Sequence, residues 1–359
     1  MKFKGSANFT HDQNDKIGVL IINLGTPDAP TPAALRKYLG EFLADHRVVE
    51  IPRLIWWLIL NLVILRIRPK KSAEAYKSVW TDSGSPLMVH TKNQSLALQQ
   101  SLQSQGMDNL VVDFAMRYGH PSIADRIESL LSQGVKKLLV LPLYPQYSAT
   151  TTASTFDAIS TDFAQRRWLP DFRFISHYHD HPAYIQAMAS RIRSHWDSNG
   201  LPDKLVLSFH GIPKRNLLEG DPYFCECHKT RRLLVEALGV DQDFVLTTFQ
   251  SRFGKQEWLK PYTDQTLQGL PALGVKSLQV FCPGFSADCL ETIEEIAVEN
   301  RDYFIQAGGE KYEYISALND LPEHIEALTQ VIKENLQGWV LDSNSSHRAQ
   351  RAQKLGADI

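Results

Sequence analysis

Short apolar runs alternate with amphipathic segments along most of the chain. Runs rich in Val, Ile, Leu and Phe predict strands at 17–24, 110–115, 137–143, 205–209, 244–248 and 278–281. Apolar residues at helical spacing predict helices at 123–131, 183–195, 230–238, 289–298 and 325–336. Continuous apolar strands that alternate with helices are typical of sheets covered on both faces, so we expect an α/β fold with doubly wound parallel sheets.

The sequence also contains an internal repeat. Gly134-Val-Lys-Lys-Leu-Leu-Val140 matches Gly274-Val-Lys-Ser-Leu-Gln-Val280. Two further pairs of segments match in the same order, 23–27 with 209–213 and 114–119 with 249–254. The repeat predicts two similar α/β domains with a cleft between them, where ligands commonly bind.

We place the first domain at 16–180 and the second at 181–337, between a polar N-terminal arm at 1–15 and a polar tail at 338–359. In the repeat, His210 takes the position that Leu24 holds in the first half. If both strand ends face the cleft, one wall carries chemistry and the other is apolar.

Composition narrows the function classes. The chain has 359 residues and a formal net charge of −2, without the basic excess expected of a nucleic-acid-binding protein. The polar N-terminal residues show no secretory signal, and four cysteines fit a reduced compartment, so we expect a cytoplasmic protein. No glycine-rich dinucleotide or Walker-type loop follows the first strand, which argues against a nucleotide cofactor.

One segment, 54–65, is almost continuously apolar and is followed by four basic residues at 66, 68, 70 and 71. As a helix it would be about 18 Å long, too short for a membrane core of about 30 Å. It is either a buried helix or an exposed apolar lip lying on a bilayer surface, with its basic flank near anionic lipid. Trp56 and Trp57 would suit that interface.

His210 is the first candidate for chemistry. It ends the apolar strand at 205–209, and Gly211 and Pro213 then turn the chain. A histidine at the carboxyl end of a strand is rigid and faces the crevice where ligands bind in α/β sheets. A neutral imidazole there can accept a proton or coordinate a divalent metal; otherwise it is a hydrogen-bonded structural residue.

Four carboxylates follow the last predicted strand. At about 100° per residue, Asp288, Glu291, Glu295 and Glu299 fall on one stripe of the predicted helix 289–298 and its ends. The stripe is either the solvated face of an amphipathic helix or, if it faces the cleft, a ladder for protons or a cation.

Other strand ends carry further candidates. Tyr144 and Tyr147 follow the third strand, where an aromatic ligand could stack, and Arg117 beside Tyr118 could pair with a ligand carboxylate. Local turn and capping chemistry is the alternative for each. The cysteines are either core residues or four thiolates for an iron–sulfur cluster, although their spacing matches no standard motif: Cys225, Cys227, Cys282 and Cys289.

Six motifs together resemble the ferrochelatase family over roughly residues 15–335: Asn23-Leu-Gly-Thr-Pro27, Arg117-Tyr118, Tyr144-Pro-Gln-Tyr-Ser148, Ser208-Phe-His-Gly-Ile-Pro213, Gly220-Asp-Pro-Tyr223 and Phe285-Ser-Ala-Asp-Cys-Leu-Glu-Thr292. The bacterial protoporphyrin-using form is the most similar. The resemblance implies two Rossmann-like domains around an active-site cleft. It also implies a lyase of haem biosynthesis that inserts Fe²⁺ into protoporphyrin IX, gives protohaem and releases two protons.

The resemblance also implies residue roles. It makes His210, Glu291, Asp288 and Glu295 catalytic, with His210 and Glu291 also the metal contacts. Asp288, Glu295 and Glu299 match the family's acidic path. It makes substrate-binding residues of Leu24, Arg117, Tyr118, Tyr147 and Phe285. Residues 51–68 fall at the family's hydrophobic lip, which implies peripheral contact with the inner membrane.

The implied reaction needs no cofactor beyond the substrate Fe²⁺. Some ferrochelatases bind a [2Fe–2S] cluster through a cysteine-rich tail, and this tail has no cysteine, so we do not expect that cluster. Cys289 stands where some relatives have a histidine. The open alternatives are a coproporphyrin III enzyme, a chelatase for another metal and tetrapyrrole, and a porphyrin carrier without catalysis. A carrier needs the apolar wall but not both His210 and Glu291.

Overall fold

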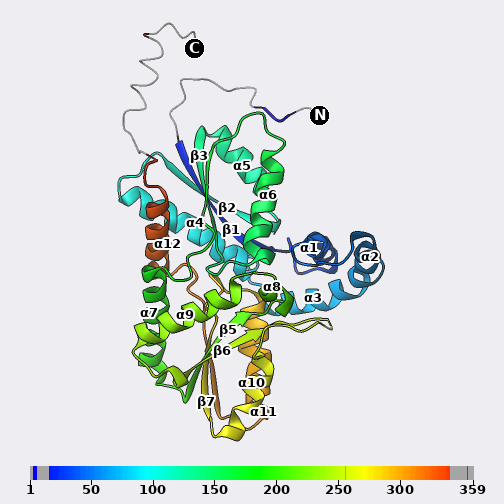
Figure 1. The fold of residues 1–359 in the computed structure, drawn as a ribbon, viewed down its shortest axis with the longest axis vertical. Helices are drawn as coiled ribbons and strands as arrows, with labels where there is room; N and C mark the ends of the chain where they lie inside the picture. Colours follow the sequence, from blue (N-terminus) through cyan, green and yellow to red (C-terminus); the bar gives the residue numbers. More distant parts are fainter. Residues whose placement is uncertain (1–2, 6–15, 255, 340–353, 355–359) are drawn as a thin grey trace.

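The computed structural model describes residues 3–5, 16–254, 256–339 and 354. Nearly all of the predicted arm 1–15 and tail 338–359 lies outside the described residues. The described part forms an α/β structure with two separate parallel sheets, one above the other in Figure 1. The prediction of doubly wound parallel sheets is therefore confirmed.

Each sheet has four strands in the same spatial order. The first sheet has the order β2-β1-β3-β4, with β1 (Lys16–Thr26), β2 (Leu110–Gly119), β3 (Val135–Pro142) and β4 (Asp171–Phe174). The second has the order β6-β5-β7-β8, with β5 (Lys204–His210), β6 (Val245–Gln250), β7 (Ser277–Phe281) and β8 (Lys311–Ile315). The corresponding orders match the internal repeat.

The central strands are apolar throughout because both of their faces are covered. Along β1, Val19 and Ile21 pack into one core, whereas Leu20 and Ile22 pack into a second core on the opposite face. Alternate side chains of a strand point to opposite faces, so a strand between two helical layers has no solvated side. The first of these cores continues beneath the second sheet, where it includes Leu207 of β5.

Helices connect the strands. The longer α-helices are α1 (Pro32–Ala44), α3 (Leu65–Val79), α4 (Pro86–Ser104), α5 (Ile123–Ser132), α6 (Ser154–Phe163), α7 (Pro182–Asn199), α9 (Tyr223–Leu238) and α12 (Pro322–Asn335). The shorter ones are α2 (Arg53–Ile59), α8 (Lys214–Leu218), α10 (Thr263–Gly269) and α11 (Arg301–Gln306). Three π-helical segments are η1 (Leu60–Ile64), η2 (Ala149–Ala153) and η5 (Glu291–Asn300).

The C-terminal helix α12 joins the two halves. It packs against α7 and also against α4 and β3 of the first half. The boundary that we predict near residue 180 falls in the loop between β4 and α7. Because α12 contacts both halves, its packing holds the two sheets together in addition to the chain segment that connects them.

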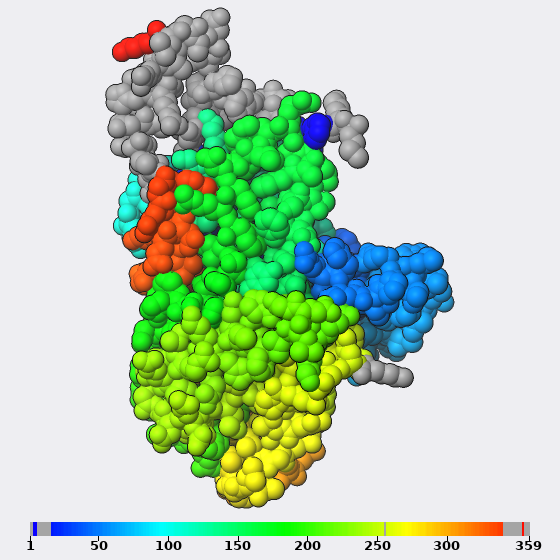
Figure 2. All heavy atoms as spheres, in the orientation of Figure 1, coloured from blue at the N-terminus to red at the C-terminus, as the bar shows by residue number. Residues whose placement is uncertain are grey.

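Residues 51–68 form part of an arm that projects from the junction of the two halves (Figures 1 and 2). The buried-helix alternative is wrong for this segment because most of its apolar side chains are exposed: Ile51, Leu54, Ile55, Trp57, Leu58, Ile59, Leu62, Val63 and Ile67. The expectation that Trp56 faces an interface is also wrong. Its ring is buried and its Nε1–H donates to the Leu43 carbonyl at 2.6 Å. Within the described residues, no helix has the length and apolarity needed to cross a membrane.

Candidate active site

A cavity lies where the carboxyl ends of β1 and β5 approach each other. It encloses about 1020 Å³ of empty space, part of it open to solvent, enough for a large organic ligand. Apolar and aromatic side chains dominate the lining, which includes Leu24, Tyr38, Phe42, Tyr76, Pro86, Leu87, Leu143, Tyr144, Phe285, Ala287 and Leu290. The histidine and the carboxylate of the lining, His210 and Glu291, both come from the second half. The expected contrast between an apolar wall and a chemical wall is therefore present.

His210 is the last residue of β5 and lines the cavity. Its Nδ1 lies 2.7 Å from the Gly211 carbonyl oxygen. A carbonyl only accepts, so Nδ1 carries the proton in this contact and the neutral ring keeps a lone pair on Nε2. Gly211 is required here because a Cβ would lie 2.8 Å from the Gln250 carbonyl oxygen. The close turn thus holds the imidazole with Nε2 available.

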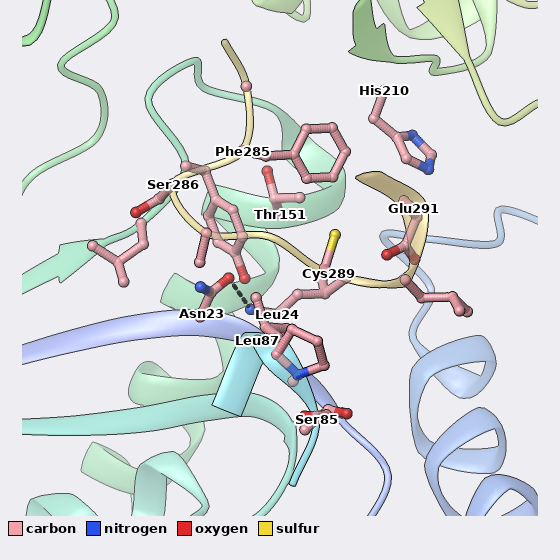
Figure 3. Close-up of a pocket in the computed structure, with 18 of the residues that line it drawn as sticks. Asn23, Leu24, Ser85, Leu87, Thr151, His210, Phe285, Ser286, Cys289 and Glu291 are labelled. Atoms are coloured by element: carbon pink, nitrogen blue, oxygen red, sulfur yellow. Dashed lines mark hydrogen bonds between the residues drawn. The ribbon is translucent and has the colours of Figure 1, made fainter. Parts of the chain in front are cut away.

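Glu291 begins the π-helix η5 and lines the same cavity. In Figure 3 its carboxylate lies on the side of the cavity that the His210 ring also faces. The two side chains reach the cavity from the ends of neighbouring strands, because β5 pairs with β7 and η5 follows β7. The sequence therefore predicted this pair correctly as neighbours at one sheet edge.

Asp288 lies in the loop before η5 and not on the helix that carries Glu291, Glu295 and Glu299. It precedes η5, is buried, and is absent from the residues that line the cavity. Its carboxylate accepts hydrogen bonds from the hydroxyls of Thr292 and Tyr314 at 3.0 and 2.6 Å and from the Asn319 amide at 2.7 Å. The α-helical projection failed because Asp288 lies in the loop before the helix and the segment after it is a π-helix with wider turns.

Glu295 lies one turn further along η5 and contacts Ser251. Burial raises the pKa of Glu295 to about 7, against the effect of the Ser251 hydrogen bonds and helped by the charge of Glu291. Glu295 and Glu299 line a second, polar cavity of about 550 Å³. The carboxylates of Glu291, Glu295 and Glu299 thus run from the main cavity to this second one, as a ladder would require.

Arg117 and Tyr118 do not line the cavity, contrary to the prediction. Arg117 Nη2 contacts Asp45 Oδ2 at 2.6 Å, and Tyr118 donates its hydroxyl to the same oxygen at 2.8 Å. Burial alone would raise the pKa of Asp45. Hydrogen bonds from Ser154, the Arg47 backbone and Tyr118, with the Arg117 charge, lower it instead. Arg117 and Tyr118 thus lie behind the cavity wall, and both of their polar groups are already bonded to Asp45.

Tyr147 is likewise absent from the cavity lining, and Tyr144 is present. The Tyr147 backbone N–H donates to Glu226 Oε2 at 2.6 Å, which ties the loop after β3 to α9. Tyr144 is buried, and burial raises its pKa above the ordinary value despite the nearby Arg117 charge. Leu24 and Phe285 line the cavity as predicted (Figure 3).

Sequence reasoning missed the aromatic contribution of the arm. Tyr38 and Phe42 of α1 and Tyr76 of α3 line the cavity, and the Tyr38 hydroxyl donates to the Gly25 carbonyl at 3.1 Å. Burial raises the pKa of both tyrosines, which keeps their phenols neutral. The i, i+4 spacing of Tyr38 and Phe42 is the signal that could have revealed this helix face.

Gly25 marks the closest approach of β1 and β2. It has φ of +114°, and a Cβ there would lie 1.9 Å from the Tyr118 carbonyl oxygen. Only glycine fits, which explains the residue that follows Leu24 in the first motif. The same close packing fixes Leu24 against the cavity.

The cysteines lie on different elements. Cys225 is exposed on α9 and Cys227 is buried in the same helix, whereas Cys282 and Cys289 are buried in separate clusters near the second sheet. Cys289 lines the cavity, and burial raises its pKa, which favours the thiol over the thiolate. Among the described residues, no three metal-binding side chains that include a cysteine come together.

Comparison with known proteins now decides the family. The family model described as ferrochelatase matches residues 16–336, nearly the whole described chain. The chain belongs to the ferrochelatase family. Members of this family are lyases that insert Fe²⁺ into protoporphyrin in haem biosynthesis, and this is the reaction of the present chain.

Curated ferrochelatases are similar to this chain over nearly their full length. The ferrochelatase of Idiomarina loihiensis is 62% identical over 99% of this chain and 98% of its own. Those of Marinobacter nauticus and Pseudoalteromonas atlantica are 61% and 60% identical, over 100% of this chain and 97% and 100% of their own.

Solved structures share the fold at low identity. SirB from Bacillus subtilis with Fe³⁺ superimposes with a TM-score of 0.51 at 12% identity, covering 92% of this chain and 98% of its own. CbiX, described as the terminal enzyme of sirohaem biosynthesis in denitrifying bacteria, gives 0.50 at 12% identity, over 89% and 100%. At this identity the likeness concerns the two-domain fold.

Proposed function

We propose that the main cavity holds protoporphyrin IX and that His210 and Glu291 carry out its metallation. One observation carries the proposal: a largely apolar cavity presents an imidazole and a carboxylate from a single wall. The apolar wall around Leu24 and Phe285 suits a flat, apolar macrocycle. The ionisable wall suits the pyrrole protons and the incoming metal.

The first proton goes to His210. A pyrrole N–H must lose its proton before Fe²⁺ can replace it. His210 lines the cavity and keeps its Nε2 lone pair because Nδ1 is held by the Gly211 carbonyl. Insertion of one Fe²⁺ releases two protons and leaves a neutral metalloporphyrin, so a second proton must follow by the same route. Returning His210 to its neutral form requires an acceptor beside it, and Glu291 supplies one.

Glu295 is the next acceptor. With a pKa of about 7 it exchanges protons readily near neutral pH. Glu299 is exposed and lines the outer cavity, so protons reach solvent there. Asp288 is left out of this path because it lies in the loop before η5 and lines neither of the two cavities.

The substrate Fe²⁺ contacts His210 and Glu291. Imidazole nitrogen and carboxylate oxygen bind Fe²⁺ less tightly than a thiolate set, and transfer to the macrocycle requires a weak hold. Burial raises the pKa of the Cys289 thiol in the same cavity, which favours the protonated form over the thiolate.

Protoporphyrin fits the cavity better than coproporphyrin III. Coproporphyrin carries four propionates and protoporphyrin two, and the described residues that line the cavity include no lysine or arginine. A carrier is disfavoured because it would gain nothing from placing both His210 and Glu291 on one wall. The lining therefore supports the protoporphyrin enzyme over the coproporphyrin III enzyme and the carrier.

The exposed apolar side chains of 51–68 lie on a membrane surface. They form the apolar lip, which has Arg66 and Arg68 at its C-terminal end and Lys70 and Lys71 shortly after it. Apolar burial and attraction to anionic lipid act together on such a segment. The lip continues into α3, whose Tyr76 lines the cavity, so an apolar porphyrin can pass between bilayer and cavity.

Glu291→Gln tests the proposed role of the carboxylate, with Glu294→Gln as the matched control on the same π-helix. We expect Glu291→Gln to lower anaerobic turnover of Fe²⁺ and protoporphyrin by about 10²–10⁴-fold with porphyrin binding retained. Glu294 is absent from the cavity lining, and its variant should stay within about threefold of the parent. Equal effects of the two substitutions would contradict the proposed path.

A further inference from the structure

Two histidines and a glutamate gather outside the main cavity. His177 and His179 lie in the loop between β4 and α7, and Glu226 lies in the first turns of α9. One ligand atom of each residue lies within 4.8 Å of the other two. None of the three lines the cavity of the proposed reaction.

The distances suit a shared ion. His177 Nδ1 lies 2.9 Å from Glu226 Oε1, and His179 Nδ1 lies 3.2 Å from Glu226 Oε2. An ion bound tetrahedrally at about 2.0–2.2 Å has its ligand atoms about 3.3–3.6 Å apart. Small side-chain movements would therefore bring the three atoms around one centre.

His179 gives a second, independent indication. Its ring is buried, with 4% of the residue exposed, and its Nδ1 makes no hydrogen bond because the nearby carboxylate oxygen is not aligned with it. A buried ring nitrogen without a partner is costly, and a bound cation would satisfy it. The Thr230 hydroxyl donates to the His179 carbonyl at 3.0 Å, which fixes this part of the loop.

The surrounding charges leave the site free for a cation. Asp180 is engaged by Lys229 at 2.5 Å, so that lysine does not neutralise Glu226. His177 is about half exposed and gives an ion access from solvent.

We propose that His177, His179 and Glu226 form a second metal site, which takes a borderline divalent transition-metal ion such as Zn²⁺, Co²⁺ or Fe²⁺. Two imidazoles and one carboxylate are typical ligands for these ions, and water completes the shell. Mg²⁺ prefers oxygen ligands and is excluded by the same set. This site does not depend on the proposed roles of His210 and Glu291.

Occupancy of the site would steady the cavity wall. Glu226 Oε2 also accepts the Tyr147 backbone N–H at 2.6 Å, and the preceding residue, Gln146, lines the cavity. The Gln146 amide donates to Thr230 at 3.0 Å on the same helix as Glu226. An ion that holds Glu226 and His179 together therefore fixes the loop after β3, whose Gln146 lines the cavity.

Zn²⁺ binding measured in a His210→Ala, Glu291→Gln background isolates this site from the main cavity. We expect one Zn²⁺ per chain by competition with a chromophoric chelator, and at least tenfold weaker binding after His177→Ala. His120→Ala removes an equally exposed histidine that contacts only one aspartate, Asp28, and should leave the affinity unchanged. Excess Mg²⁺ should not compete, whereas anaerobic Fe²⁺ should.

A crystal of the zinc-loaded parent chain locates the ion directly. An anomalous peak at the zinc edge between His177, His179 and Glu226 is the expected result. Unchanged affinity in His177→Ala, or zinc found elsewhere with this site empty, would overturn the proposal. Because His177 is exposed, its variant is expected to fold, and a circular dichroism melt of each variant checks this.

Discussion

Ser251 donates hydrogen bonds to both carboxylate oxygens of Glu295. Its backbone N–H lies 2.8 Å from Oε1, and its hydroxyl donates to Oε2. These bonds hold the pKa of Glu295 below the value that burial and the neighbouring Glu291 charge would otherwise give. Ser251 therefore lowers the pH above which Glu295 is deprotonated and can accept a proton.

Ser251→Gly should shift the pH dependence of turnover. Ser251 has φ of +61°, which glycine adopts without strain, so the change removes the hydroxyl and preserves the backbone. Losing a hydrogen bond to a charged carboxylate raises its pKa by about one unit. The limb along which kcat rises with pH should move upward by about that amount, measured over pH 5–9.

Glu295→Gln serves as the control for this shift. It removes the titrating group, so the limb near pH 7 should disappear in both the parent and the Ser251→Gly background. A pH profile that keeps its limb after Glu295→Gln assigns that limb to another group. Protons would then leave the cavity by a route other than η5.

Asp45→Asn should destabilise the fold. Asp45 compensates the largely buried Arg117, and leaving such a charge uncompensated costs about 3 kcal/mol. The folded pKa of Asp45 lies below its ordinary value, so its stabilisation is present above pH ~4 and is lost as pH falls through the folded pKa. Urea unfolding should show the full difference at pH 7 and a smaller one toward pH 3.

Asp28→Asn is the matched control for Asp45. Asp28 is half exposed and pairs with Lys37 at 3.8 Å, so its loss should cost under about 1 kcal/mol. If Asp45→Asn left stability unchanged and altered only porphyrin affinity, Arg117 would belong to substrate binding, as the sequence first suggested.

Replacing Leu54, Trp57 and Ile67 with serine should weaken membrane binding. Each is more than half exposed, and their loss removes apolar area and an interfacial aromatic ring. We expect at least tenfold weaker binding to anionic vesicles in a flotation assay, with turnover of detergent-delivered porphyrin unchanged.

Leu201→Ser with Leu273→Ser provides the control for the apolar lip. Both leucines are more exposed than Trp57, but they lie outside the arm. Their replacement should leave vesicle binding intact. If the lip variant instead changed the oligomeric state in sedimentation and bound vesicles normally, the lip would be a subunit interface.

The features that could be predicted from the sequence are those that a continuous run of neighbouring residues determines. The apolar central strands were found because both faces of β1 and β5 are buried, and His210 was found because a strand ends there. The edge strands β4 and β8 were missed because Asp171–Phe174 and Lys311–Ile315 are short and mix polar with aromatic residues.

Long-range partners could not be predicted. Asp45 is the acceptor that occupies Arg117 and Tyr118, and it lies 72 and 73 residues away from them along the chain. The π-helical form of η5 likewise has no signature in the spacing of apolar residues, so Asp288 was placed on the wrong stripe. Both errors arise from tertiary contacts that override local pattern.

Anaerobic turnover of His210→Ala with Fe²⁺ and protoporphyrin IX tests the central claim most directly. Porphyrin binding, followed by fluorescence, should stay within about threefold of the parent, because the apolar wall is intact. Turnover should fall by about 10²–10⁴-fold, and added imidazole should restore part of it. A variant that binds porphyrin and still forms protohaem within tenfold of the parent rate would contradict the role of His210 as the proton acceptor.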